Sequence, residues 1–414
     1  MNLVVLTPHF APDVAPTGEV VTRVVAELAV RGHQIDVVTS LPWYREHRIE
    51  PGYEGKLVRR EDTPWGSITR VHPFPTADKR NIAGRAASFA GFSALGGLLA
   101  ARGGAIDGVL AVSPPLTLGI AGWIAARVRR APLVFNIQDV FPDVAVELGV
   151  IRNPGVIRAA HALERFAYAR ADAITVLSDD LRGNVAAKTH RPEKVRVIPN
   201  FVDTGAIRPS PRENSYRAEY GLTDKMVVMY AGNVGLSQSL DTVIEAAAAL
   251  SYEPGLVFVV NGQGASRAEL ERKAAGLPNV RFVDMQPVER LPEVLAAADV
   301  HLVPLRKGLA RSSVPSKTYS ILAAGRPLVA SVDEGSEVAR LVERAGAGYS
   351  VTPDDAEALT KALRRMLDSP EEAAEMGGRG REFVEHWASP AAVAGSYEAL
   401  FDELLAARAS RRPG

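Results

Sequence analysis

The chain has 414 residues, a length that favours two domains of roughly 200 residues each over a single core. Its 48 Lys and Arg balance 48 Asp and Glu, and it is 47% hydrophobic. This balance provides no overall field for nucleic acid or acidic partners, so any anion site must be built locally. The absence of Cys excludes disulfides, thiolate zinc sites and thiol catalysis.

The N-terminus passes directly into a strand-like run, without a basic and apolar leader. The longest uncharged stretch, Ala86–Ala101, has 16 residues, whereas a bilayer span needs about 20 mostly apolar ones. We therefore expect an intracellular, cytoplasmic protein.

Short apolar runs alternate with helical patterns along the whole chain. In the first half the predicted strands are Leu3–Leu6, Ile35–Val38, Val109–Val112, Leu133–Ile137, Ala173–Val176 and Val195–Ile198. In the second half they are Met226–Tyr230, Leu256–Val260, Val280–Val283, Val300–Val303, Leu328–Ala330 and a run near Tyr349. Continuous apolar runs are typical of parallel strands covered on both faces. The alternation predicts an α/β protein of two doubly wound, Rossmann-like domains.

The alternation is interrupted between Asn200 and about Tyr220, where prolines and charged residues accumulate. We therefore place an N-terminal domain at 1–202 and a C-terminal domain at 203–388. Residues 389–414 are expected to hold a last helix that crosses back to the first domain, followed by a frayed tail.

Paired α/β domains bind ligands in the crevice at the carboxyl ends of their strands, so the loops after strands are the places to search. After the first strand, Gly18 opens a helix, but the Gly-x-Gly-x-x-Gly of a dinucleotide fold is missing. This disfavours a nicotinamide dehydrogenase. Gly18 either lets a helix N-terminus approach a phosphate or sugar, or it is an ordinary turn glycine.

Two glycine pairs follow strands of the second domain. Gly232, Asn233 and Gly235 form a small loop whose backbone N–H groups are expected to face an anion, and Ser239 is the predicted cap of the next helix. After the following strand, the segment 261–264 contains Gly262 and Gly264 and leaves room for a flat group against the backbone. Each pair alone is weak evidence.

The segment 305–327, LRKGLARSSVPSKTYSILAAGRP, carries most of the information about the ligand. It is basic, and its Lys317 lies at the predicted start of an apolar helix. A cation is electrostatically misplaced there unless an anion joins it, which a bound pyrophosphate would do. The alternative is a solvated lysine at an ordinary helix start.

Nine stretches in order along nearly the whole chain resemble the GT-B glycosyltransferases of family 4, in the branch that builds bacterial surface polysaccharides such as O-antigen and colanic acid. They are PHFAPDVAPTGEVVTRVVAELAVRGHQIDVVTS, FNIQDVFPDVAVELGV, ADAITVLSDDL, VIPNFVDT, YAGNVGLSQSLDTVIEAA, NGQG, NVRFVDMQP, LAAADVHLVPL and VPSKTYSILAAGRPLVA.

The resemblance implies two Rossmann-like domains that face a central cleft, retention of anomeric configuration, and no metal or other cofactor. The sequence agrees with the last point, because it contains no Asp-x-Asp to hold a divalent cation on a pyrophosphate. The family typically carries two glutamates where this chain has Ser312 and Ser320. The second usually binds the ribose, and a serine cannot make the charge-assisted bond of a carboxylate.

Without a metal, preorganised cations and helix N-termini must stabilise the departing pyrophosphate. We expect Lys317 to do this, and Asp139, near the acceptor, to accept a proton or orient a hydroxyl; alternatively Asp139 caps a turn. The remaining predicted donor contacts are Gly18, Gly232, Asn233, Gly235, Gln238, Gly262, Gly264, Arg311, Pro315, Ser316 and Ser320.

The predicted reaction moves a hexosyl- or N-acetylhexosaminyl-type sugar from a nucleotide sugar, with UDP the expected nucleotide, to a glycan or polyprenyl-linked acceptor. Residues 79–102 either contact a membrane surface beside that acceptor or form a buried helix. Two alternatives stay open: a nucleotide-sugar epimerase of similar fold, and a non-catalytic binding protein derived from a transferase.

Overall fold

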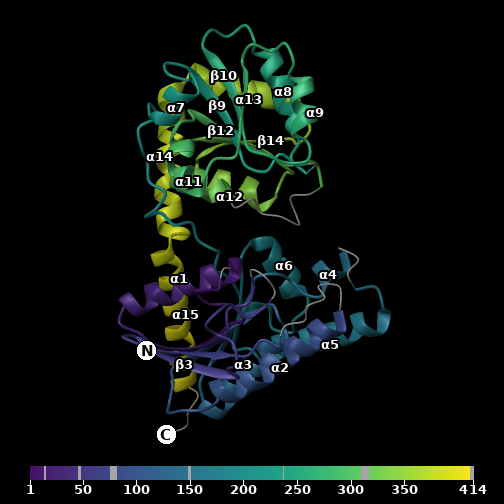
Figure 1. The fold of residues 1–414 in the computed structure, drawn as a ribbon, viewed down its shortest axis with the longest axis vertical. Coiled ribbons are helices and arrows are strands. Elements are labelled where there is room, and N and C mark those ends of the chain that lie inside the picture. The colour runs from purple at the N-terminus through teal and green to yellow at the C-terminus, as the bar shows by residue number, and fades with distance from the viewer. Residues whose placement is uncertain are drawn as a thin grey trace. The chain divides into compact units, whose positions relative to one another are not determined.

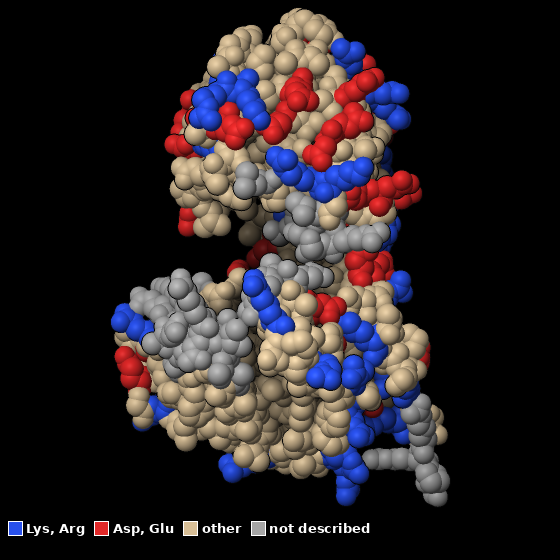
Figure 2. All heavy atoms as spheres, turned by 90° about the vertical axis from the view of Figure 1, so that its right-hand side faces the viewer, with Lys and Arg blue, Asp and Glu red and all other residues tan. Residues whose placement is uncertain are grey.

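A computed structural model describes residues 1–13, 15–44, 48–74, 82–147, 151–235, 237–308 and 317–410. The chain divides into two compact units (Figure 1). Unit 1 comprises Met1–Asn200 and Pro390–Gly414, and unit 2 comprises Phe201–Ser389. On the face drawn in Figure 2, acidic and basic side chains are interspersed over unit 2, whereas unit 1 shows a broad area of other residues bordered mainly by basic side chains.

Unit 1 contains a sheet of strand order β3-β4-β2-β1-β5-β6-β7-β8. The strands are β1 (Asn2–Leu6), β2 (Gln34–Ser40), β3 (Val58–Thr63), β4 (Gly66–Val71), β5 (Gly108–Ser113), β6 (Leu133–Ile137), β7 (Ala173–Val176) and β8 (Val195–Val197). The helices are α1 (Pro16–Val30), α2 (Ile82–Ala100), α3 (Thr117–Arg129), α4 (Asp143–Glu147), α5 (Pro154–Arg170), α6 (Asp179–Ala187), the short 3₁₀ turn η1 (Pro192–Lys194) and α15 (Pro390–Ala409).

Helices cover both faces of this sheet, and the direction of each crossover decides which face a helix takes. The connections through α2, α3 and α5 all advance from β4 towards β7, so right-handed crossovers place these helices on one face (Figure 1). The opposite face receives α1 and α15. Phe401 of α15 is fully buried and lies where a Cβ at Gly108 would come within 2.3 Å of its ring.

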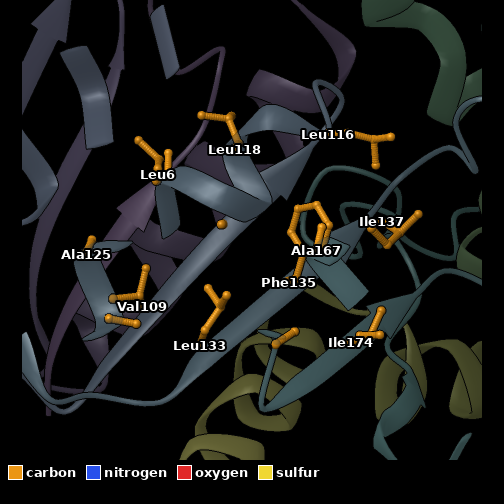
Figure 3. Packing of buried hydrophobic residues seen from close by; sticks show 14 of the residues in the cluster. Leu6, Val109, Leu116, Leu118, Ala125, Leu133, Phe135, Ile137, Ala167 and Ile174 are labelled. Carbon is orange, nitrogen blue, oxygen red and sulfur yellow. The ribbon is translucent and has the colours of Figure 1, made fainter. Parts of the chain in front are cut away.

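The core of unit 1 forms from the continuous apolar strands predicted for a parallel sheet. Leu6, Val109 and Phe135 are fully buried between the sheet and the helices that carry Leu118 and Ala167 (Figure 3). Each buried side chain of this size contributes about 1.5–3 kcal/mol relative to exposure.

Unit 2 contains a parallel sheet of order β11-β10-β9-β12-β13-β14. The strands are β9 (Met226–Ala231), β10 (Leu256–Asn261), β11 (Val280–Val283), β12 (Val300–Pro304), β13 (Leu328–Ser331) and β14 (Gly348–Val351). The helices are α7 (Ser215–Glu219), α8 (Leu240–Ala249), α9 (Arg267–Lys273), the 3₁₀ turn η2 (Val288–Arg290), α10 (Leu291–Ala296), α11 (Lys317–Ala323), α12 (Glu337–Ala345), α13 (Ala356–Asp368) and α14 (Pro370–Trp387). The two parallel-sheet units confirm the predicted α/β fold class.

One part of the sheet in unit 1 was not predicted. The strands β3 and β4 form an antiparallel hairpin at the edge of the sheet, with Val58 opposite Val71 and Thr63 opposite Gly66. The sequence of β3, VRREDT, alternates between exposed and half-buried residues and is largely charged. Charge is typical of an edge strand, which needs no continuous apolar run.

Candidate functional site

A cavity of about 750 Å³ opens in unit 2 at the carboxyl ends of its central strands. Its walls come from the segments that follow β9, β10, β11 and β12 and from the start of α11. The lining residues are Tyr230, Ala231, Gly232, Asn233, Ser237, Gln238, Asn261, Met285, Gln286, Pro287, Val288, Leu291, Val294, Leu295, Leu305, Lys317 and Ser320. The volume suits a ligand of nucleotide size.

The position of this cavity follows from the strand order of unit 2. From β9 the chain adds β10 and β11 on one side, and it then returns to add β12, β13 and β14 on the other. The two loops after β9 and β12 therefore diverge at this switch point and leave a crevice between them. Gly232 comes from the first loop, and Lys317 comes from the segment after β12.

Lys317 points its ammonium at this crevice. A Cβ at Gly232 would lie only 2.8 Å from Lys317 Nζ, and Gly232 itself has a φ of +141°, so this position requires glycine. Protein atoms surround the ammonium, and the loss of water lowers the pKa of Lys317 to about 7. Within the described part of the chain, no hydrogen bond or ion pair engages this group.

The glycine loop after β9 corrects one expectation. Its N–H groups are mostly used inside the protein: Gly232 donates to the carbonyl of Asn261 at 2.9 Å, and Gly235 donates to Gln238 Oε1 at 3.1 Å. Val234 donates to the carbonyl of Gln263 at 2.8 Å. The loop therefore does not offer a row of free donors to an anion.

Gly262 and Gly264 serve the packing of two neighbouring loops. A Cβ at Gly262 would lie 1.8 Å from the Gly232 oxygen, and one at Gly264 would lie 2.3 Å from the Val234 oxygen. Their missing side chains let the loop after β10 support the loop after β9. Neither glycine lines the cavity, and neither does Gly235, so their contact with a donor stays a prediction.

The other predicted donor residues divide into two groups. Gly232, Asn233, Gln238, Lys317 and Ser320 all line the cavity. Three others, Arg311, Pro315 and Ser316, lie outside the described residues, as does Ser312, one of the two positions where the family carries a glutamate.

Ser239 occupies the N-cap position of α8, but its side chain does not cap the helix. Its hydroxyl bonds instead to the carboxylate of Asp354, and its Oγ lies 2.8 Å from Thr242 Oγ1. The prediction of a side-chain cap was therefore wrong.

The apolar wall of the cavity was not predicted. Met285 and Val288 follow β11 and are 48% and 74% exposed, although both side chains are large and hydrophobic. Two strand spacings, about 10 Å, separate the end of β11 from the end of β9. The cavity therefore extends from a cation near β9 and β12 to an apolar surface near β11. The only signal in the sequence was the run Met285-Gln286-Pro287-Val288 directly after the predicted strand, which places two large apolar residues in a loop.

Asp139 follows β6 of unit 1, at the carboxyl edge of that sheet. Surrounding protein atoms remove water from its carboxyl and raise the pKa of Asp139 above its usual value. The described residues provide no hydrogen-bond partner for this carboxylate. The side chain therefore does not cap the turn before α4, which removes the structural alternative for Asp139.

A second polar pair at the carboxyl edge of unit 1 was not predicted. His9 Nδ1 lies 2.6 Å from Asp13 Oδ2, while the buried Asp13 accepts backbone N–H bonds from Trp43 and Tyr44 through Oδ1. The signal was the i, i+4 spacing of His9 and Asp13. Gly18 supports this loop, because a Cβ there would lie 2.8 Å from His9 Cβ.

Among the described residues, the group with metal-ligand spacing is Asp143, His161 and Glu164, in unit 1. A lysine already fills it: Lys188 Nζ lies 2.7 Å from Asp143 and 2.9 Å from Glu164. The ammonium compensates both carboxylates, and hydrogen bonding to it helps to lower the pKa of Asp143. This cluster is an ion-pair network that joins α4, α5 and α6.

None of the described helices is long and apolar enough to cross a membrane. Of the segment 79–102, residues 79–81 lie outside the described part of the chain, and α2 packs on the sheet through the buried Phe92. Its contact with a membrane surface stays a prediction.

Comparison with known proteins agrees with this architecture. Residues 17–200 match the model of the glycosyl transferase 4-like domain, and residues 225–369 match that of glycosyl transferases group 1. The chain is 30% identical to the putative colanic acid biosynthesis glycosyl transferase WcaI of Escherichia coli K12, over 89% of this chain and 93% of that protein. It is 28% identical to the probable glycosyltransferase WbjE of Pseudomonas aeruginosa, over 61% and 63% of the two chains.

Solved structures share the fold at lower identity. Sucrose-phosphate synthase of Thermosynechococcus elongatus matches with a TM-score of 0.65 and 19% identity, covering 98% of this chain and all of that one. HepE of Anabaena, in complex with UDP, matches with a TM-score of 0.65 and 15% identity over 97% of this chain and all of that one. The chain belongs to the group 1 (family 4) glycosyltransferases of the GT-B fold.

Proposed function

We propose that this glycosyltransferase moves a sugar from a nucleoside-diphosphate sugar, with retention of anomeric configuration and without a metal ion. The acceptor is a glycan or a lipid-linked glycan used in surface polysaccharide synthesis, and the reaction takes place on the cytoplasmic side. UDP is the proposed nucleotide.

One observation carries this proposal: the Lys317 ammonium lies in a nucleotide-sized cavity without an ionic partner among the described residues. Burying an uncompensated cation is costly, and its lowered pKa expresses that cost. A diphosphate in the crevice would restore the charge and accept hydrogen bonds from the ammonium. Nothing in the apolar wall near Met285 and Val288 competes for the phosphates, and this surface suits a flat base.

The reaction requires negative charge to be stabilised on the departing diphosphate while the anomeric carbon becomes oxocarbenium-like. A fixed cation such as Lys317 does this without reorganisation. In unit 1, Asp139 has a carboxylate that is free to accept a proton from an acceptor hydroxyl or to orient it. Metal independence is supported by Lys317 and by the absence of an Asp-x-Asp sequence.

The proposed substrates are supported by named relatives. HepE was solved with UDP, which supports UDP as the nucleotide. Relatives at 28–30% identity include mannosyltransferases that depend on GDP-mannose, so GDP must be tested beside it. WcaI is named for colanic acid biosynthesis, which supports a polysaccharide precursor as the acceptor.

Calorimetric titration with UDP, GDP, TDP and NAD, in EDTA, tests the donor site. We expect one nucleoside diphosphate to bind the wild type and to bind Lys317→Ala about 10- to 100-fold more weakly, as expected for a lost charged hydrogen bond. The matched control is Lys361→Ala, because Lys361 is exposed on α13. Equal binding by Lys317→Ala, or binding only when Mg²⁺ is added, would contradict the proposal.

A further inference from the structure

A buried asparagine interrupts the apolar pattern of β10. On this strand Val257, Val259 and Asn261 point to the same face of the sheet, because the side chains of a strand alternate. The two valines pack in an apolar cluster with Tyr216 of α7 and Val294 of α10. Asn261 is only 3% exposed, yet it carries an amide. Burying a polar group costs free energy unless its hydrogen bonds are made, so the partners of this amide decide what it does.

One half of the Asn261 amide is used inside the protein. The Tyr216 hydroxyl donates to Asn261 Oδ1 at 2.8 Å. Tyr216 is fully buried, and burial raises its pKa above the usual value, so the hydroxyl keeps its proton at neutral pH. Among the described residues, Asn261 Oδ1 is the acceptor for that proton. Turning the amide over would leave the proton without an acceptor, so Tyr216 fixes which way the amide faces.

The other half of the amide is left for the cavity. Asn261 lines this cavity, and within the described part of the chain nothing accepts a hydrogen bond from its Nδ2. The backbone is fixed as well, because the Asn261 carbonyl accepts from Gly232 at 2.9 Å. The result is a rigid N–H2 group that can donate to a ligand, while the oxygen of the same amide is turned towards Tyr216.

The place of Asn261 in the sheet puts it between the two ends of the cavity. In register it lies between the last residues of β9 and β11. Neighbouring strands are about 5 Å apart. The amide is therefore one strand spacing from the loop after β9, where Lys317 lies, and one from the apolar wall of Met285 and Val288. A flat base on that wall, with its diphosphate at Lys317, would turn an edge towards Asn261.

The side chain of Gln286, which also lines the cavity near the apolar wall, is already engaged. Its Nε2 donates to the Tyr220 hydroxyl at 3.1 Å and to the Asp284 carbonyl at 3.0 Å. Its Oε1 accepts from Arg290 at 2.8 Å. None of the described lining residues is acidic, so this part of the cavity offers no carboxylate to accept a bond from an amino group.

We propose that Asn261 selects the donor by its base: Nδ2 donates a hydrogen bond to a ring carbonyl oxygen, and Tyr216 is the positioning residue that holds the amide in this orientation. Uracil, thymine and guanine present such an oxygen where cytosine and adenine carry an amino group. An N–H2 group attracts the carbonyl but meets a second donor in the amino group. The site therefore takes keto bases and rejects amino bases. This inference rests on the proposed function, because it assumes that the cavity holds the nucleotide.

Calorimetric titration of the wild type with two pairs of nucleotides tests the selection before any substitution is made. The pairs are UDP with CDP, and GDP with ADP, and the members of each pair carry a carbonyl or an amino group at the same ring position. In the pair that binds, we expect the keto nucleotide to bind about 10- to 100-fold more tightly, because the amino base loses a hydrogen bond and leaves a buried donor unpaired.

Asn261→Asp replaces the donor with an acceptor of the same shape. We expect it to reverse the ratio of the two affinities, so that the amino nucleotide binds more tightly. The matched control is Asn233→Asp, which adds the same charge to the same cavity on the loop after β9. That charge should repel the diphosphate and weaken both nucleotides equally, leaving the ratio unchanged.

Tyr216→Phe tests the positioning role, because it removes only the hydroxyl. The freed amide can turn its oxygen towards the base, so the preference for the keto nucleotide should fall several-fold. A merely structural role of Tyr216 would weaken both nucleotides alike. Thermal unfolding shows which variants fold, and Asn261→Leu serves if Asn261→Asp does not. Because leucine neither donates nor accepts, its ratio of affinities should approach one.

Two results would overturn this inference alone. Equal binding of keto and amino nucleotides to the wild type would show that the base is not selected in this way. A ratio unchanged by Asn261→Asp, as in the Asn233→Asp control, would assign the amide to the ribose or the phosphates. In both cases the loss of affinity in Lys317→Ala would still support the proposed function. Binding of none of the four nucleotides would overturn the proposed function and this inference together.

Discussion

Lys317 and Tyr230 form a cation–π pair in the cavity of unit 2, with Lys317 Nζ 3.8 Å from the centre of the Tyr230 ring. The ring is fixed from its other end, because the Tyr230 hydroxyl donates to the carbonyl of Asn233 at 2.5 Å. The aromatic face attracts the ammonium but carries no net charge to neutralise it. The pair therefore holds Lys317 at the glycine loop and leaves its charge available to a ligand.

The lowered pKa of Lys317 predicts how donor binding depends on pH. Because that pKa is about 7, the free protein loses the ammonium proton as pH rises above 7. A diphosphate binds the charged form, so binding at higher pH must take up a proton. We expect the affinity for the nucleoside diphosphate to fall by up to about tenfold per pH unit above 7, until the raised pKa of the complex is reached.

Calorimetry in two buffers of different ionisation enthalpy measures this proton uptake. Lys317→Arg is the matched variant, because a guanidinium stays charged across this range and should give a much flatter pH profile. The same slope in wild type and Lys317→Arg would assign the titration to another group.

We expect the Ser320 hydroxyl to contribute modestly to binding of the nucleotide's ribose. Its side chain lines the cavity on α11 and has no hydrogen-bond partner among the described residues. A neutral hydroxyl bond is worth about 0.5–1.5 kcal/mol, so Ser320→Ala should weaken UDP binding about 2- to 10-fold. If Ser320 contacts the ribose, a deoxyribose nucleotide lacking the contacted hydroxyl should bind both proteins equally. A loss of UDP affinity as large as that caused by Lys317→Ala would instead indicate that the cavity has collapsed. Ser396→Ala on α15 provides the control.

The close packing at Gly262 leads us to expect that donor binding depends on how the loops after β9 and β10 pack together. A Cβ there would lie 1.8 Å from the Gly232 oxygen, so Gly262→Ala must displace the loop after β9. Overpacking of this kind costs about 1–3 kcal/mol, and the displaced loop should also weaken nucleotide binding. Thermal unfolding and calorimetry measure the two effects.

The control for Gly262 is Gly183→Ala in α6, where nothing lies within 4 Å of the added methyl group. Alanine favours a helix interior by up to about 1 kcal/mol, so this variant should be neutral or slightly stabilised. If Gly262→Ala melts and binds like Gly183→Ala, the close approach of the two loops is not required.

Continuous apolar runs such as Leu133–Ile137 coincide with β6, because a parallel strand covered on both faces needs apolar residues at every position. Strand β3 was missed because it lies at the edge of the sheet, where no continuous apolar run is needed, and its neighbour β4, GSITRV, also lacks such a run. Lys317 was identified by its charge at a helix start, a local signal that survives in the folded protein.

The remainder of the site depends on contacts between distant segments. The N–H groups of the loop at Gly232–Gly235 were expected to face a ligand, but Asn261 at the end of β10 accepts the bond from Gly232, and Gln263 just beyond it accepts the bond from Val234. The partnership of Lys317 with Tyr230 joins residues 87 positions apart in the chain. Local patterns carry no information on either pairing, because both arise only when the sheet brings the strand ends together.

We expect substitution of Asp139 to reduce the rate of sugar transfer without weakening the binding of the donor. Its carboxylate lacks a described partner, and partial burial raises its pKa. If it accepts a proton from the acceptor, Asp139→Asn should lower kcat by about 10²- to 10⁴-fold, the usual contribution of a general base. UDP affinity should not change, because the cavity proposed to bind the donor is built from unit 2. The wild-type rate should fall as pH decreases through the raised pKa of Asp139, since protonation removes the base. This decrease at low pH, the acid limb of the profile, should be absent from Asp139→Asn.

Asp402→Asn, at an exposed position of α15, controls for the charge change. A rate unaffected by Asp139→Asn, or an unchanged acid limb, would assign proton transfer to another group, and His9 held by Asp13 is the next one to test.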